Sequence, residues 1–126
     1  MQGLLDTNIL IDFLRNHTPA QAWLKTQSQL GICGIVEMEL IAGASNTIKQ
    51  REVLNLLRNF ITIEMNNADI IWATRQLTRF HLSHNVGILD CLIAAPVARL
   101  QVPFYTLNIK HFTPLLGNLV IRPYQP

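Results

Sequence analysis

The sequence contains only two cysteines, few acidic residues and no apolar run long enough to cross a membrane. Cys33 and Cys91 lack the close spacing of a zinc or redox motif, so we interpret both as reduced core residues. The first residues reach an acid at Asp6 with no basic region ahead of the apolar run, which argues against a signal peptide. We therefore expect a cytoplasmic protein with no membrane segment and no zinc site.

Internal repeats, low-complexity tracts and linkers are also absent from the 126 residues. Because 49% of the residues are hydrophobic, the chain can bury a sizeable core, and we expect one domain over residues 1–126. A net charge of +2 permits a nucleic-acid partner but does not require one. Composition alone therefore does not identify the function.

Short apolar strands alternate with helices along the chain. The expected strands cover residues 3–6, 30–33, 60–64, 104–107 and 119–122. The expected helices cover residues 8–15, a segment with Thr18 as its N-cap, 36–43, a segment to about residue 59 that Ser45 could cap, 67–84, 88–100 and 108–116. This alternation predicts an α/β fold, with three α/β/α layers around a central, mostly parallel sheet of four to five strands.

Three carboxylates lie in apolar stretches where a core residue is expected: Asp6, Glu39 and Asp90. Burying one unpaired carboxylate costs several kcal/mol, which is comparable to the whole stability of a small domain. The chain has only eight acidic residues, so three of them at such positions need a reason. A bound cation is the simplest one.

The expected topology can bring these acids to one end of the sheet. Asp6 ends the first strand, Glu39 lies one turn into the helix after the second, and Asp90 opens the helix before the fourth. In parallel sheets the functional crevice lies at the carboxyl ends of the strands. Mutual repulsion there would raise the pKa of at least one carboxylate, and a divalent cation would relieve it. Oxygen ligands favour Mg²⁺, with Mn²⁺ as a possible substitute.

Four motifs in order resemble those of a known family: LLDTNILIDFL, EMELIAG, LDCLIAA and YTLNIKHF, followed by VIRPYQP. They resemble the successive motifs of the PIN domain, in particular the VapC-type ribonuclease toxins of toxin–antitoxin pairs. The resemblance runs from about Leu4 to Pro123, and its strength lies in the order and spacing of all four motifs. It implies a PIN-like fold.

The resemblance also implies an activity, a Mg²⁺-dependent endoribonuclease. Asp6 would be the first metal ligand, Glu39 the second acid and Asp90 the third. Metal-activated water would hydrolyse RNA phosphodiester bonds and leave 5′-phosphate and 3′-hydroxyl ends. Glu39 would order or deprotonate that water, although a direct ligand role is equally consistent with the sequence.

Five further polar residues fit the resemblance as supporting residues. Thr7 and Asn8 would hold the turn and donate to the carboxylate of the preceding acid, and Thr106 and Asn108 match the polar pair after the fourth strand. His111 stands where the family pattern has a fourth acid, which leaves open whether one metal ion or two are bound.

The resemblance implies three partners: an RNA substrate, a cognate VapB-like antitoxin and a second copy of the chain in a homodimer. Neither the RNA nor its cleavage site follows from the sequence. The alternative is a non-catalytic PIN-like module that binds RNA or protein. Retention of three costly acids argues against that alternative.

Several acids have competing interpretations. Asp6 could simply cap the helix that follows it. Glu37 competes with Glu39 for the second acidic position, because residues two apart on a helix face different directions. Asp12 and Asp69 are interpreted as structural, the latter because a carboxylate in the first turn favours the helix dipole.

Overall fold

The computed structural model describes residues 1–126, which fold around a five-stranded sheet. The strands are β1 (Gly3–Leu5), β2 (Leu30–Cys33), β3 (Ile61–Ile63), β4 (Phe104–Tyr105) and β5 (Val120–Ile121). Their order is β3-β2-β1-β4-β5, and all four neighbouring pairs are parallel. From β1, the chain adds β2 and β3 on one side and β4 and β5 on the other, so the switch point of the topology lies between β1 and β4.

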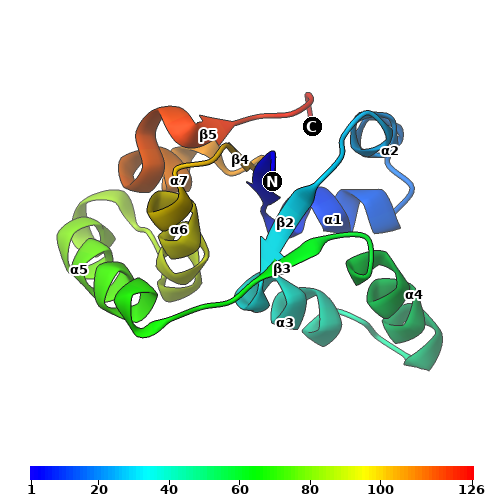
Figure 1. Ribbon diagram of the computed structural model, residues 1–126, viewed down its shortest axis with the longest axis horizontal. Coiled ribbons are helices and arrows are strands. Elements are labelled where there is room, and N and C mark those ends of the chain that lie inside the picture. The colour runs from blue at the N-terminus through cyan, green and yellow to red at the C-terminus, as the bar shows by residue number, and fades with distance from the viewer.

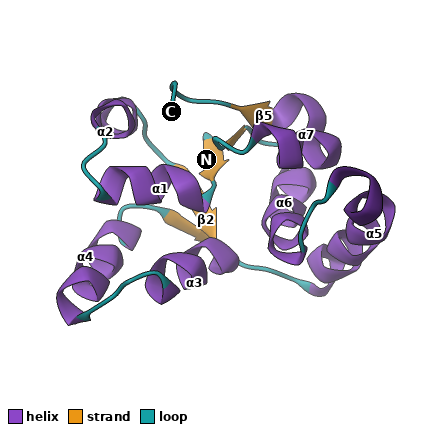
Figure 2. Ribbon diagram, turned by 180° about the vertical axis from the view of Figure 1, so that it is seen from behind, coloured by secondary structure: helices purple, strands orange, loops and turns teal.

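Seven α-helices cover the sheet. They are α1 (Thr7–Leu14), α2 (Thr18–Lys25), α3 (Gly34–Ala42), α4 (Thr47–Leu57), α5 (Asn67–His84), α6 (Ile88–Leu100) and α7 (Ile109–Leu116), with a short 3-10 turn at Gly117–Leu119. Helices α1 to α4 gather on one side of the strands and α5 to α7 on the other (Figures 1 and 2). The predicted α/β fold with a parallel central sheet is confirmed. No helix is both long enough and apolar enough to span a membrane.

The hydrophobic core forms where the two helical layers meet the sheet. The central strands are buried on both faces, and Leu4, Leu5, Ile32 and Phe104 are 2% exposed or less. The sequence of a strand that is buried on both faces is a continuous apolar run. This explains why apolar and polar residues do not alternate in the short strands β1 and β2. The core therefore holds the carboxyl ends of β1, β2 and β4 in fixed register.

Two predicted helix caps are wrong. Thr18 lies inside α2, whose N-cap is His17. The cap of α4 is Asn46, whose side chain accepts a hydrogen bond from the amide of Lys49, and Ser45 lies one residue outside. Asparagine caps as well as serine does, so two such residues in a row leave the start of the helix undetermined by one position.

Helices α5 and α6 are joined by a buried ion pair. The Asp69 side chain is almost fully buried, and its Oδ1 and Oδ2 accept from Arg99 at 3.0 and 3.1 Å. Asp69 also accepts from the amide of Asn66, whose side chain accepts from the amide of Asp69 in a capping box. The interpretation of Asp69 as structural thus agrees with the role it has in the fold.

Replacing Asp69 by alanine is expected to lower the free energy of unfolding by about 2–3 kcal/mol, because one substitution removes both the ion pair and the capping box. The value is below that of a fully buried pair because Arg99 is one-third exposed and keeps some of its hydration. Urea denaturation would measure the change. Glu52→Ala, at an exposed position of α4, is the control and should leave stability unchanged. Equal stability of both variants would contradict this role.

Candidate active site

Asp6 lies at the switch point of the sheet, directly after β1. Its side chain is 6% exposed and accepts from the amide of Thr7 at 2.8 Å, so it is also the N-cap of α1. Its other oxygen, Oδ2, accepts from the hydroxyl of Thr106 at 2.6 Å. Thr106 follows β4 and is fully buried. The interpretation of Asp6 as a helix cap is therefore correct but incomplete, because a capping aspartate does not need a second hydrogen bond from the residue that follows β4.

Thr7 connects the first two acidic positions. Its hydroxyl donates to Glu39 Oε1 at 2.5 Å, while its amide donates to Asp6. Glu37 points elsewhere and accepts from the hydroxyl of Thr62, in β3, at 2.8 Å. Of the two competing acids on α3, Glu39 is therefore the one that faces Asp6.

Asn8 and Asn108 brace the loop that follows β4. The expected hydrogen bond from Asn8 to the carboxylate of Asp6 is not formed. The amide nitrogen of Asn8 lies 3.4 Å from the hydroxyl of Thr106, and its oxygen accepts from the amide of Leu107. The amide of Asn108 also donates to the Thr106 hydroxyl, at 2.9 Å. These contacts fix the Thr106 hydroxyl so that its proton points at Asp6.

Asp90 and His111 complete the arrangement from α6 and α7. Asp90 Oδ2 accepts from the amide of Gly87 at 3.0 Å, which fixes its side chain at the start of α6. His111 Nδ1 lies 3.6 Å from the same oxygen and 3.2 Å from the side-chain nitrogen of Asn108. His111 is thus in contact with the third acidic position.

All eight residues singled out from the sequence lie in one continuous set of contacts, which we call the acid network. It runs through Glu39, Thr7, Asp6, Thr106, Asn8, Asn108, His111 and Asp90. Its members come from α1, α3, α6, α7 and the loops after β1 and β4. Residues more than 100 positions apart are thereby brought together.

The electrostatics of the network centre on Asp6. The pKa of Asp6 is raised from 3.8 to about 6, and burial is the largest cause. The hydrogen bonds from Thr106 and Thr7 oppose this rise, and the negative charges of Glu39 and Asp90 add smaller contributions to it. Without a cation the site is therefore under strain at neutral pH, because the ionised form of Asp6 is disfavoured.

The acidic side chains of the network carry oxygen donors, which are the ligand type that hard divalent cations prefer. No three His, Cys, Asp or Glu side chains are close enough to share one ion. Mg²⁺ is held in proteins by one or two carboxylates and retains several waters, so Asp6 and Asp90 are the residues that would hold such an ion.

Residues interpreted as structural lie outside the network. Asp12, on α1, accepts from the hydroxyl of Tyr124 at 3.0 Å. Burial, followed by this contact with Asp12, raises the pKa of Tyr124. Sequence reasoning missed Arg15 and Lys49, which line a pocket together with Glu39. No motif spacing could have found them, because α1 and α4 meet only in the folded chain.

The comparison with protein families decides the identity of the fold. The model of the PIN domain matches residues 3–108. This chain belongs to the PIN domain family. A PIN domain is what the four motifs predicted, and the matched range includes Asp6, Glu39, Asp90 and Asn108. A comparison with curated proteins finds no match.

Several solved structures resemble this one along nearly its whole length. A toxin–antitoxin complex from Klebsiella pneumoniae has a TM-score of 0.83 at 24% identity, covering 99% of this chain and 100% of that one. VapBC-1 from nontypeable Haemophilus influenzae has a TM-score of 0.80 at 22% identity, covering 98% of both chains. FitAcB from Neisseria gonorrhoeae has a TM-score of 0.74 at 18% identity, covering 97% and 98%. At these identities the likeness shows the fold.

Asp6→Asn is expected to stabilise the metal-free PIN domain at pH 7 by about 1–2 kcal/mol. A pKa raised from 3.8 to about 6 corresponds to about 3 kcal/mol against folding above pH 6, and weakening the bond from Thr106 offsets about 1 kcal/mol of the gain. The folded state binds the extra proton between pH 4 and 6, so the stability of the wild type should fall as pH rises through that window. Urea denaturation in chelator at several pH values would measure both effects.

Asp12→Asn is the matched control, because it makes the same substitution on α1, the helix that Asp6 caps, and lies outside the acid network. It should not raise stability at pH 7. A wild type whose stability is flat between pH 4 and 6 would contradict the assigned strain at Asp6.

Proposed function

We propose that this protein is a Mg²⁺-dependent endoribonuclease and the toxin of a VapBC-type toxin–antitoxin pair. The observation that carries the proposal is the acid network, which holds a buried Asp6 beside the charges of Glu39 and Asp90 at the switch point of a PIN fold. In a protein without catalytic activity, holding these carboxylates together would only lower the stability of the fold. We propose one nuclease domain over residues 1–126.

Asp6 and Asp90 are the proposed ligands of Mg²⁺, with Mn²⁺ as a substitute. When bound, the ion neutralises charge on the scissile phosphate and lowers the pKa of a bound water. The hydroxyl of Thr106 donates to the Asp6 carboxylate and lowers its pKa, which partly offsets burial in favour of the ionised, ligating form. The amide of Gly87 orients Asp90 in the same way.

Glu39 is the proposed general base. Thr7 holds one of its oxygens, which leaves the other oxygen to orient the attacking water and accept its proton. The water oxygen would bond to phosphorus, and the ribose 3′-oxygen would depart and take a proton from solvent water, so the products would carry 5′-phosphate and 3′-hydroxyl ends. The 2′-hydroxyl then serves recognition rather than attack.

His111 and Asn108 are proposed positioning residues. His111 contacts Asp90 and Asn108 rather than open solvent alone, and Asn108 in turn contacts Thr106. With a histidine in place of a fourth acid, the site favours one firmly held ion. Substituting a residue that orients a metal ligand typically costs about 10–100-fold in affinity or activity, which is the expected effect of His111→Ala.

The proposed partners are an antitoxin and a second copy of the chain. The similar structures carry names of toxin–antitoxin complexes, which supports a VapB-like antitoxin. Exposed apolar side chains on α5 and α6, including Leu82 at 96% and Ile88 at 63%, support a homodimer, because such side chains often mark an interface. We propose that both assemblies form in the cytoplasm.

The decisive experiment is cleavage of total cellular RNA by purified, antitoxin-free protein. Asp6→Asn and Asp90→Asn should abolish cutting, and Glu39→Gln should lower the rate by about 100-fold or more, as expected for loss of a general base. Glu37→Gln is the matched control, since it lies on the same helix but faces Thr62. Cutting should require Mg²⁺ or Mn²⁺, stop with chelator and leave 5′-phosphate ends.

Metal binding gives a readout that does not depend on cutting. Mg²⁺ should raise the melting temperature of the wild type and of Glu37→Gln, but not that of Asp6→Asn. Absence of both cleavage and metal-dependent stabilisation would refute the nuclease and leave the non-catalytic interaction module. Cleavage that persists in Asp6→Asn would refute the assignment of the site.

A further inference from the structure

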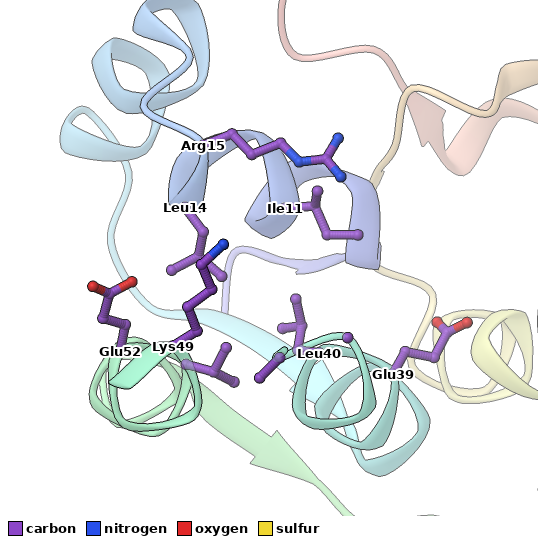
Figure 3. Close-up of a pocket in the computed structure, with 10 residues that line it drawn as sticks. Ile11, Leu14, Arg15, Glu39, Leu40, Lys49 and Glu52 are labelled. Carbon is purple, nitrogen blue, oxygen red and sulfur yellow. The ribbon is translucent and has the colours of Figure 1, made fainter. Parts of the chain in front are cut away.

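The two ends of the acid network border different parts of the fold. Glu39, at one end, borders the pocket between α1, α3 and α4 (Figure 3). Asp90, at the other end, lies in the first turn of α6, which follows the three-residue turn 85–87 at the end of α5. The last residue of that turn is Gly87, whose amide holds the Asp90 carboxylate. The position of Asp90 therefore depends on the conformation of the turn.

A histidine in the last turn of α5 holds this connection. His81 Nδ1 lies 2.8 Å from the carbonyl oxygen of Val86. A carbonyl oxygen only accepts hydrogen bonds, so Nδ1 carries the proton and donates it. Val86 is fully buried, and no other donor reaches its carbonyl oxygen. The imidazole therefore fixes the direction of this carbonyl.

The carbonyl of Val86 and the amide of Gly87 belong to the same peptide group. A peptide group is planar and rigid, and its C=O and N–H point in opposite directions when the bond is trans, as it is here. The N–H of Gly87 donates to Asp90 Oδ2 at 3.0 Å. By holding the carbonyl, His81 thus fixes the direction of the N–H that holds Asp90.

The end of a helix does not by itself require this contact. The C-terminus of α5 is already closed by Asn85, which adopts a left-handed φ of 55° and donates its amide to the carbonyl of His81 at 2.9 Å. The imidazole contact lies one residue further along, at the carbonyl next to Gly87. Hydrogen bonds in series polarise one another, so the bond from His81 also makes the Gly87 N–H a better donor.

Asp90 has one carboxylate oxygen engaged and one free. Oδ2 accepts from Gly87 and lies 3.6 Å from His111 Nδ1, whereas no hydrogen bond reaches Oδ1. The turn thus engages Oδ2 and leaves Oδ1 available to a cation. At the far end of the helix pair, the ion pair of Asp69 with Arg99 ties α5 to α6. The two helices are therefore tied together at both ends.

We propose that His81 is a positioning residue for Asp90, the proposed metal ligand. It acts through the peptide group between Val86 and Gly87 rather than by touching the ion or the RNA. This inference rests on the proposed ribonuclease function, since it assigns a role at the same site. Substituting a residue that orients a metal ligand typically lowers affinity by about 10–100-fold. Because His81 acts one contact further out, we expect a loss at the lower end, about tenfold.

The first measurement uses the wild type without metal and does not depend on a variant that folds. Nitrogen-15 NMR of the histidine rings at about pH 8, where an unperturbed imidazole is neutral, should show His81 protonated at Nδ1. A neutral His81 that carries its proton at Nε2 would overturn the proposal, because a bare Nδ1 cannot donate to Val86.

Three variants then test the link to Gly87. His81→Leu removes the donor, and His81→Asn restores one, since an asparagine amide can donate from about the position of Nδ1. His84→Leu is the matched control, because it makes the same substitution in the last turn of α5, where His84 contacts Ser83 and Phe80 but not the turn. Hydrogen exchange of the Gly87 amide should accelerate by about tenfold in His81→Leu, as expected for one lost hydrogen bond. The other two variants should match the wild type.

Titration with Mg²⁺, followed by amide chemical shifts well below the melting temperature, measures the effect on the site. The affinity should fall by about tenfold in His81→Leu and stay within about twofold of the wild type in His81→Asn and His84→Leu. The Mg²⁺ concentration for half-maximal RNA cleavage should rise by the same factor. A His81→Leu protein that is less stable but binds Mg²⁺ as tightly as His84→Leu would overturn the proposal, because His81 would then act only as a helix cap.

Failure of the proposed function gives a different pattern. A wild type that neither binds Mg²⁺ nor cuts RNA overturns the function, and with it any role of His81 toward a metal ligand, whatever the exchange rate of Gly87. A wild type that binds and cuts, together with a His81→Leu variant that equals His84→Leu in amide exchange and Mg²⁺ affinity, overturns the positioning role alone.

Discussion

The buried carboxylate of Asp6 is the constraint on which the rest of the site depends. It ends β1, and β1 pairs with β4, so the residue that follows β4 is placed where its hydroxyl can reach the carboxylate. The same aspartate caps α1, and the first helical residue carries the hydroxyl that binds Glu39. One acid therefore fixes the positions of a strand, a loop and two helices.

This arrangement works against folding stability when no cation is bound. The pKa of Asp6 is raised by burial and by two nearby charges, and only two hydrogen bonds oppose that rise. The protein tolerates the cost because stability is supplied elsewhere, by the apolar central strands and by the ion pair between α5 and α6. Functional sites are commonly destabilising in themselves, and other parts of the fold supply the stability that compensates for them.

The sequence predicted the elements better than the contacts between them. Both long helices, at 67–84 and 88–100, were predicted with their observed bounds, because apolar residues recur at helical spacing. The acids were recognised from carboxylates in apolar surroundings. The partners of Asn8 were not foreseen, since its contact with Leu107 spans 99 positions and depends on the pairing of β1 with β4. The sequence around Arg15 and Lys49 did not indicate that the two side chains line one pocket in the folded chain.

Helix α3 shows how narrowly the site is specified. It starts directly after β2, so no loop can absorb an error in its rotation. Residues two apart on a helix differ by about 200° in direction. Glu37 therefore reaches Thr62 in β3, whereas Glu39 reaches Thr7 beside Asp6. A shift of two residues would exchange the two acids. It would also remove Glu39 from the pocket between α1, α3 and α4, so the rotation of one helix sets both the acidic centre and the lining of the pocket beside it.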